Sequence, residues 1–286
     1  MPAYPFIDTH LHVWDPNHLR YPWLDEIPLL NKPYLLEDYD EATEGLSIEK
    51  LVFLQCECLP SQCEQEAQWV IELAAKDSRI QGLVPWAPLE KGEEARDIIE
   101  RFSQIELIKG IRRIIQFEED QRFCLQPNFV RGVQMLADYD LSFDICISHT
   151  QLANTIKLVE QCPHVQFILD HIAKPDIKNG NLDPWRVEVH ELAQHQNVFC
   201  KISGLATEAD RNWKPADLAP YLEHVISSFG EDRIVFGGDW PVVCQASTYK
   251  QWVKALDEFL ERESASMRKK LYYQNAILFY KLPIDP

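Results

Sequence analysis

The sequence predicts an α/β fold, a distorted TIM-type (β/α)8 barrel, and three observations carry this prediction. First, apolar runs rich in β-branched residues alternate along the whole chain with stretches of helical periodicity. Second, several runs (LVFLQC, FDICIS and QFILD) are continuously apolar, which is typical of parallel strands covered on both faces. Third, the length of 286 residues suits one barrel, and the Gly-rich first turn of many open doubly wound sheets is missing.

Eight apolar runs define the expected strands, which in chain order are residues 6–13, 50–56, 81–87, 108–115, 142–148, 166–170, 198–203 and 234–238. Helices between them are expected from apolar stripes formed by Ala67, Val70, Ile71 and Ala74; by Ala95, Ile98, Ile99, Phe102 and Ile105; by Leu218, Tyr221, Leu222, Val225, Ile226 and Phe229; and by Trp252, Ala255, Leu256 and Phe259. A last helix around residues 267–280 is expected to close the barrel.

The connection over residues 14–38 is long and carries several prolines. We expect it either to lie over the top of the barrel as part of a substrate pocket or to be a surface excursion with a structural role. No low-complexity linker and no repeat beyond the strand–helix alternation interrupts the chain. Residues 1–286 are therefore expected to form a single domain.

Composition excludes several function classes. Hydrophobic residues make up 46% and charged residues 26% of the chain, an ordinary globular balance. The net charge of −17 argues against nucleic-acid and membrane partners, because both require a basic surface. No signal peptide is evident and no apolar run approaches the ~18 residues of a membrane helix, so a cytoplasmic protein is expected. Eight scattered cysteines favour free thiols, and the lack of G-x-G-x-x-G and Walker motifs argues against nucleotide binding.

The opening stretch FIDTHLHV ends in two histidines one residue apart, His10 and His12. Because side chains alternate along a strand, both are expected on one face, with Asp8 behind them on the same face. Two imidazoles on one face suit a divalent metal, an anion or a carbonyl group. A chance H-x-H on a surface strand is the alternative, and the polar residues at the other strand ends argue against it.

Asp239 follows the eighth expected strand, in the stretch VFGGDWP. Catalytic residues of barrels lie at the C-terminal ends of strands, and the last strand neighbours the first, so Asp239 is expected beside the two histidines. The preceding glycines allow a close turn that points the carboxylate inward as a general base on water or a metal ligand; a loop-capping role is the alternative. His171, which ends the stretch FILDH, is expected to polarise a carbonyl group or to be a third metal ligand, with a core histidine as the alternative.

Two further strand ends carry candidate substrate-binding residues. Only one of the adjacent Arg112 and Arg113 can face inward, where a guanidinium would clamp a carboxylate or the carbonyl group of a sugar acid. At the end of the fifth strand either His149 or Gln151 faces the site, because a one-residue shift reverses the face.

Lys201 lies inside an apolar strand, where a functional role and a buried ion pair are both consistent with the sequence. Aromatic faces for a sugar ring are expected from Trp86 and Trp240, as well as from Trp14 and Trp213. Simple packing is the alternative for each of these tryptophans.

Taken together, the stretches IDTHLHVWDP, IKGIRR, FILDHIAKP, KISGL and FGEDRIVFGGDWPV resemble the amidohydrolase superfamily across essentially the whole chain. More narrowly, the chain is similar to the amidohydrolase-related sugar-acid and muconate-type lactonases, among them L-fuconolactonase-like and L-rhamnonolactonase-like enzymes. The resemblance implies a distorted (β/α)8 barrel that hydrolyses a C–O or C–N bond. It also implies that His10, His12, His171 and Asp239 bind metal or substrate, that Asp239 activates water and that Arg112 contacts the substrate.

One departure from the wider superfamily matters. The bridging lysine or glutamate of two-metal members is not cleanly present, because the fourth strand ends in Arg112. We therefore expect one divalent metal ion, with zinc as the expected ion and a metal-free site as the alternative. The expected activity is a lactonase acting on a small lactone or sugar acid. A decarboxylase of the aminocarboxymuconate type and a non-catalytic ligand-binding barrel remain alternatives, and both a monomer and a homodimer are open.

Overall fold

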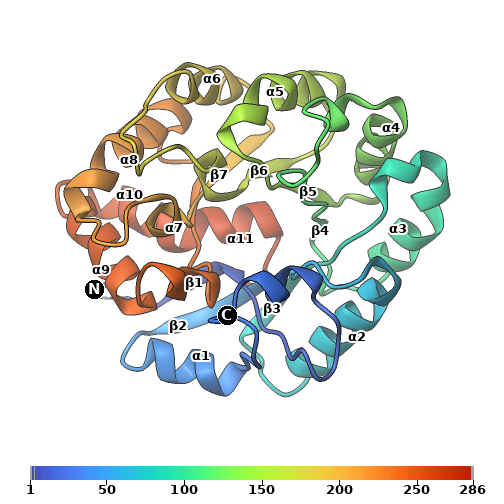
Figure 1. Ribbon diagram of the computed structural model, residues 1–286, viewed down its shortest axis with the longest axis horizontal. Helices are drawn as coiled ribbons and strands as arrows, with labels where there is room; N and C mark the ends of the chain where they lie inside the picture. The colour runs from blue at the N-terminus through green and yellow to red at the C-terminus, as the bar shows by residue number, and fades with distance from the viewer. Residues whose placement is uncertain (1, 3, 285–286) are drawn as a thin grey trace.

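Eight parallel strands lie inside a ring of helices in the computed structural model, which describes residue 2 and residues 4–284 (Figure 1). The strands are β1 (Phe6–Leu11), β2 (Ile48–Leu54), β3 (Ile80–Val84), β4 (Gly110–Ile111), β5 (Ser142–Ile145), β6 (Phe167–Leu169), β7 (Val198–Ile202) and β8 (Ile234–Phe236). Each overlaps its predicted range and ends before the predicted C-terminal limit. The residues beyond each strand leave the sheet, because they form the loops that carry the polar side chains.

The strands pair in two parallel groups, in the order β1-β2-β3 and β4-β5-β6-β7-β8. Two isolated parallel bridges join the edges of these groups, Leu83 with Ile108 and Leu11 with Trp240. The ring of strands is therefore closed by short contacts rather than by full ladders. This is the distorted (β/α)8 barrel that the strand–helix alternation predicts.

Most of the α-helices cover the outside of this ring, and the last two lie beneath it. The α-helices are α1 (Leu36–Thr43), α2 (Cys63–Ala74), α3 (Arg96–Ser103), α4 (Pro127–Met135), α5 (Leu152–Gln161), α6 (Trp185–Leu192), α7 (Leu205–Glu208), α8 (Pro215–Phe229), α9 (Tyr249–Leu260), α10 (Ala265–Lys269) and α11 (Asn275–Tyr280). The predicted apolar stripes face inward; on α8, for example, Leu218, Leu222 and Val225 are at most 1% exposed. In the described part of the chain, no helix has the length and apolar character needed to span a bilayer.

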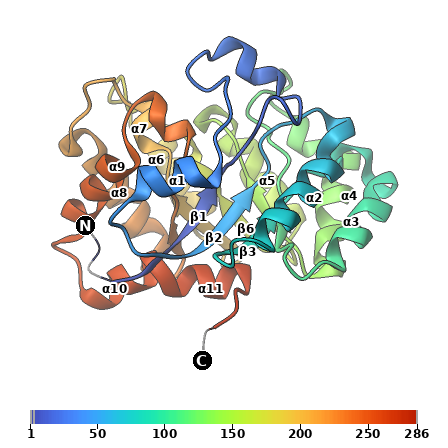
Figure 2. The same cartoon turned by 90° about the horizontal axis from the view of Figure 1, so that it is seen from below.

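The C-terminal helical segment closes the lower end of the barrel, as the sequence predicts. α10, a π-helical turn (Lys270–Gln274) and α11 follow one another without a loop, and they pass beneath the strands (Figure 2). Phe279 and Tyr280 enter the apolar interior between the strands, where the ring of Phe279 lies 5.0 Å from that of Phe199. This end of the barrel is a packed core.

The connection between β1 and α1 lies at the opposite end, above the barrel (Figure 2). The Trp14 indole N–H donates to the carbonyl groups of Leu30 and Lys32, at 3.1 and 3.0 Å, and so ties the loop to the end of β1. Trp14, Trp23 and Ile27 line a cavity at this end. Of the two interpretations of this loop, the one that places it over the top of the barrel is confirmed.

The eight cysteines form no disulfide bonds in the structure, and six of them are buried. This confirms the prediction of free thiols.

Candidate active site

Two adjacent cavities open at the C-terminal ends of the strands. The inner cavity has a volume of about 180 Å³ and is lined by His12, Arg112, His171 and Asp239, among others. The outer cavity is wider, about 980 Å³, and is lined by charged residues of both signs. The two cavities share six lining residues, Lys174 among them, and so lie against each other.

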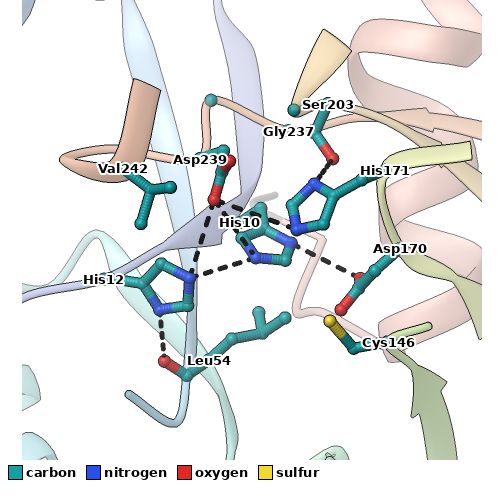
Figure 3. Close-up of polar contacts among 12 residues, drawn as sticks. His10, His12, Leu54, Cys146, Asp170, His171, Ser203, Gly237, Asp239 and Val242 are labelled. Atoms are coloured by element: carbon teal, nitrogen blue, oxygen red, sulfur yellow. Dashed lines mark hydrogen bonds and ion pairs between the residues drawn. The ribbon is translucent and has the colours of Figure 1, made fainter. Parts of the chain in front are cut away.

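Three histidines and one carboxylate converge at the inner cavity (Figure 3). The Oδ1 atom of Asp239 lies 3.7 Å from Nε2 of His10, 3.8 Å from Nε2 of His12 and 3.9 Å from Nε2 of His171. All four side chains are at most 6% exposed. The structure thus brings together the residues that the sequence predicts as metal ligands and catalytic groups, from β1, β6 and β8.

The hydrogen bonds of the histidines orient their ring nitrogens. His12 Nδ1 lies 2.8 Å from the carbonyl oxygen of Leu54, which can only accept, so Nδ1 carries the hydrogen and Nε2 carries the lone pair. His171 Nδ1 contacts the Ser203 hydroxyl at 2.9 Å, which leaves Nε2 facing Asp239. Burial lowers the pKa of His12 to about 3 and holds the pKa values of His10 and His171 well below their usual range, so the three imidazoles are neutral.

Asp8 is placed differently from the prediction. Asp8 of β1 pairs with Leu51 of β2, and Leu11 pairs with Phe53. The step from the first pair to the second spans three residues on β1 but only two on β2, so β1 contains one extra residue there. This bulge reverses the face of the strand between Asp8 and the histidines. Asp8 therefore points into the helix layer, where its carboxylate accepts hydrogen bonds from Tyr39 and Tyr249 at 3.0 and 2.9 Å.

The outward turn of Asp8 positions Asp239. The Asp8 carboxylate also accepts a hydrogen bond from the Gly238 N–H, at 2.7 Å, which ties the end of β8 to β1. A side chain at Gly238 would overlap the Tyr249 ring and the Asp8 carboxylate, so only glycine fits this contact. Asp239 itself has a φ of +55° and donates its N–H to the carbonyl oxygen of His10 at 2.9 Å. Burial raises the pKa of Asp239 to about 7, a value suited to a general base.

A left-handed turn follows β6 and positions His171. Four consecutive residues from His171 to Lys174 have φ between +49° and +63°, although none is glycine. Left-handed backbone costs such residues about 1–2 kcal/mol each. Residues three apart in such a tight turn lie on one side, and accordingly both His171 and Lys174 line the inner cavity.

Contacts with residues from other parts of the chain hold this turn in place. The Trp185 indole N–H donates to the carbonyl oxygen of Ile172 at 2.7 Å, and His149 Nδ1 donates to that of Lys174 at 2.9 Å. Gly204 packs against the His171 ring, where an added Cβ would lie 2.5 Å from Nδ1. The turn is therefore fixed by contacts with residues distant in sequence, which offset its intrinsic strain.

Arg112 is the arginine that faces inward, and its neighbour Arg113 forms ion pairs with Glu90 and Glu118 outside the inner cavity. Arg112 Nη1 lies 3.2 Å from His10 Nε2 and 3.1 Å from Asp170 Oδ2. The guanidinium thus places a fixed positive charge beside the histidines.

Asp170 and Asp144 are site-supporting residues that the sequence analysis missed. Lys201 Nζ lies 2.9 Å from Asp170 Oδ1 and 2.9 Å from Asp144 Oδ2, and all three side chains are fully buried. Burial disfavours the charge of Asp170, yet Lys201, His10 and Arg112 hold its pKa well below the usual value. An aspartate and a lysine inside apolar strands each require a buried partner, and this signal in FDICIS and FCKIS would have predicted the pair.

Three predicted substrate-binding residues, Lys201, Trp240 and Trp86, line neither cavity. Lys201 is enclosed by its two carboxylates, and Trp240 packs between Tyr34 and Tyr39 in the layer outside the strands. Trp86 lies beside Ile98 in a separate surface depression, because β3 ends at Val84 and the chain then turns outward.

At the end of β5 the structure distinguishes the two candidates. His149 lines the outer cavity, whereas Gln151 is 1% exposed and lines neither cavity. The Gln151 amide instead donates to the Ile115 carbonyl oxygen and accepts from the Ser148 N–H, both at 3.0 Å. Of the other tryptophans, Trp14 lines the inner cavity, and the Trp213 indole donates to the Ala246 carbonyl oxygen at 3.1 Å.

The donor set fits one divalent metal ion. Tetrahedral Zn²⁺ with bonds of ~2.0–2.1 Å separates its ligand atoms by about 3.3–3.5 Å, close to the 3.1–3.8 Å found among His10, His12 and Asp239. His171 Nε2 lies 3.9 Å from Asp239 Oδ1 on the other side of this group. His12 Nε2 carries a lone pair and lies 3.1 Å from His10 Nε2, which accepts a hydrogen bond from Arg112, and 3.8 Å from Asp239 Oδ1. These closely spaced acceptors repel one another, and a bound cation would offset that repulsion.

Comparisons with known proteins agree with this geometry. A family model described as amidohydrolase matches residues 7–282. An uncharacterised protein of Sinorhizobium fredii is 30% identical over 96% of this chain and 98% of its own length. An L-fucono-1,5-lactonase of Burkholderia multivorans is 29% identical over 97% of this chain and 96% of its own. The crystal structure of an amidohydrolase from Burkholderia multivorans with bound zinc superimposes with a TM-score of 0.87 at 29% identity, covering 98% of this chain and all of that one.

Proposed function

The chain belongs to the amidohydrolase family, and on that premise we propose that it is a lactonase that opens the ring of a sugar-acid lactone with water activated by Asp239. One observation carries the proposal. A buried carboxylate whose pKa is raised to about 7 lies in a small cavity beside three neutral imidazoles and one arginine. This set supplies a base for water and a positive charge for an oxyanion, which is what ester hydrolysis requires.

Asp239 begins the reaction by taking a proton from water, and the water oxygen forms a bond to the ring carbonyl carbon. Negative charge then develops on the carbonyl oxygen. The guanidinium of Arg112, which Asp170 holds at 3.1 Å, stabilises this charge. The ring C–O bond breaks, and Asp239 returns the proton to the leaving ring oxygen. The product is an open hydroxy acid, and no further acid is needed.

His10, His12 and Asp239, with His171, are the residues that would hold a divalent metal ion. When bound, such an ion supplies Lewis-acid stabilisation of the oxyanion and lowers the pKa of water. The bound zinc of the Burkholderia amidohydrolase structure supports the same choice of ion for this chain.

The inner cavity supports a small ring as the substrate. A volume of about 180 Å³ has room for a single sugar-sized ring. The indoles of Trp14 and Trp23 supply apolar faces at its wall, while His12, Arg112 and Glu57 supply polar groups. The Burkholderia multivorans relative is an L-fucono-1,5-lactonase, which supports an aldonolactone as the substrate of this chain.

A lactone panel in a pH-indicator assay tests the proposal. We expect acid release from one or more aldonolactones, at a rate that depends on enzyme concentration. Carbon dioxide release from an aromatic or muconate acid, with no acid release from lactones, would instead establish a decarboxylase. Ligand binding without either reaction would establish a non-catalytic barrel.

A further inference from the structure

Glu57 occupies an unusual backbone position just beyond the end of β2. Its φ is +54°, in the left-handed region, which residues other than glycine, asparagine and aspartate rarely adopt. Residues held in sparsely populated backbone conformations cluster at active sites and ligand-binding sites, where the surrounding structure maintains the strain. The conformation therefore raises the question of what the Glu57 side chain does.

Glu57 is one of the residues that line the inner cavity. Its Oε1 atom accepts a hydrogen bond from the Gln55 side-chain amide at 2.7 Å, and the Glu57 N–H donates back to the Gln55 side-chain oxygen. Among the described residues, Oε2 has no hydrogen-bond partner and no ion pair. One carboxylate oxygen is thus held in place while the other remains free to accept from a ligand.

Gln55 also fixes the position of Arg112. Its carbonyl oxygen accepts a hydrogen bond from Arg112 Nη2, while its side chain holds Glu57. Gln55 is fully buried, so it is a rigid connection between the two. The free oxygen of Glu57 and the guanidinium that faces the reacting carbonyl are therefore held in a constant relation to each other.

A second carboxylate in a cavity of this size has a defined chemistry. It attracts hydroxyl groups, which donate short charge-assisted hydrogen bonds to carboxylate oxygens, and it repels anionic groups. The proposed reaction already uses Asp239 as the base, and Glu57 lies on a different strand end. Its carboxylate is thus available for recognition.

We propose that Glu57 is a specificity-determining residue whose free carboxylate oxygen accepts a hydrogen bond from a ring hydroxyl group, so that the enzyme selects polyhydroxylated lactones over deoxygenated ones. This inference rests on the proposed lactonase function and names the substrate feature that the site reads. Gln55 positions Glu57 for this contact.

The test compares D-galactono-1,4-lactone with γ-butyrolactone, which has the same five-membered lactone ring without the hydroxyl groups and the dihydroxyethyl side chain. Glu57→Ala is expected to lower kcat/KM for the galactonolactone by about ten- to hundredfold, which corresponds to the loss of one charge-assisted hydrogen bond. The kcat/KM for γ-butyrolactone is expected to stay within about twofold of the wild-type value. Glu57→Gln keeps an acceptor oxygen, so its kcat/KM for the galactonolactone is expected to fall less than that of Glu57→Ala. An equal loss on both lactones would overturn the proposal, because it would place Glu57 in the chemistry or in the fold.

Glu57→Gly separates recognition from structure. Glycine adopts a φ of +54° without strain, so this variant is expected to keep or raise Tm while it loses the preference for hydroxyl groups. Asp140→Gly is the matched control, since Asp140 has a φ of +56° on an exposed loop outside both cavities. It is expected to keep both Tm and selectivity close to the wild type. A lower Tm for Glu57→Gly with unchanged selectivity would show a structural role and overturn the proposal.

Different measurements would refute the lactonase function and the role of Glu57. If the wild type hydrolyses no lactone, the proposed function fails. Calorimetric titration of galactonolactone into wild type and Glu57→Ala then still tests the inference. A weaker affinity in Glu57→Ala would support the contact, and equal affinities would overturn it.

Discussion

The two ends of the barrel are built on opposite principles. At the upper end, beyond β2, β6 and β8, lie six of the eight non-glycine residues with positive φ in the described chain: Glu57, His171, Ile172, Ala173, Lys174 and Asp239. The lower end is an apolar core closed by α11, where Phe279 and Tyr280 pack among the strand side chains. The comparison teaches that stability comes from the lower end and the helix layer, while the upper end carries strain in order to position polar groups.

Asp239→Asn gives the largest expected effect and acts only at the upper end. The amide keeps the shape of the side chain and cannot accept the proton of water, so kcat is expected to fall by about 10²- to 10⁴-fold. Tm is expected to stay constant or rise, because burial already disfavours the charged carboxylate. Lactone turnover and a thermal melt check both parts. If Asp239→Asn lowers the fraction of folded protein and the activity falls in the same proportion, the upper end also contributes to stability and the contrast between the two ends is wrong.

Phe279→Ala tests the lower end. The substitution leaves a cavity in the apolar cluster and is expected to lower the free energy of unfolding by about 3–5 kcal/mol. At a temperature where the variant is folded, kcat is expected to stay within about twofold. Leu278→Ala on the same helix is the control, since Leu278 is 66% exposed and its loss is expected to change stability by less than about 0.5 kcal/mol. Denaturant unfolding measures both; a large fall in kcat for folded Phe279→Ala would show that the two ends are coupled.

Gly204→Ala tests how firmly the left-handed turn depends on its neighbours. The new Cβ would lie 2.5 Å from His171 Nδ1, and Gly204 itself has a φ of +69°. We expect a loss of about 1–3 kcal/mol in stability together with a fall in kcat of up to about 10²-fold, because His171 is displaced. Gly180→Ala is the matched control, with a φ of +68° and no atom near the added Cβ. Gly180→Ala is expected to lower the free energy of unfolding by only about 1 kcal/mol and to leave kcat unchanged. Equal falls in kcat for Gly204→Ala and Gly180→Ala would contradict the steric argument.

The last prediction changes no residue and concerns the response of the upper end to pH and metal, which is small within one pH unit of neutrality. The raised pKa of Asp239 means that its carboxylate binds a proton as pH falls below about 7 and then cannot act as a base. For chelator-treated enzyme, kcat/KM is expected to fall tenfold per pH unit below about 7. A bound cation favours the ionised carboxylate, so zinc-reconstituted enzyme is expected to show the same fall at a lower pH. A pH profile of the chelator-treated enzyme that stays flat down to pH 5 would contradict Asp239 as the buried base.

Much of the upper end was nonetheless predictable. The H-x-H pattern after an apolar run, and the aspartate after two glycines at the last strand, identified groups that the structure brings within 4 Å of one another. The choice between Arg112 and Arg113 was not predictable, and neither was that between His149 and Gln151. Each depends on which face a residue takes after the strand has ended.

What the sequence alone determined is the alternation of strands and helices, the closure by the C-terminal helix and the kinds of residue at the strand ends. These follow from local hydrophobic periodicity, which needs no knowledge of distant contacts. Only the tertiary structure decided that a bulge turns Asp8 outward, that a left-handed turn carries His171 and Lys174 inward, and that Lys201 is enclosed by two carboxylates. The physical reason is that each of these conformations is unfavourable locally and becomes stable only through partners far away in the chain.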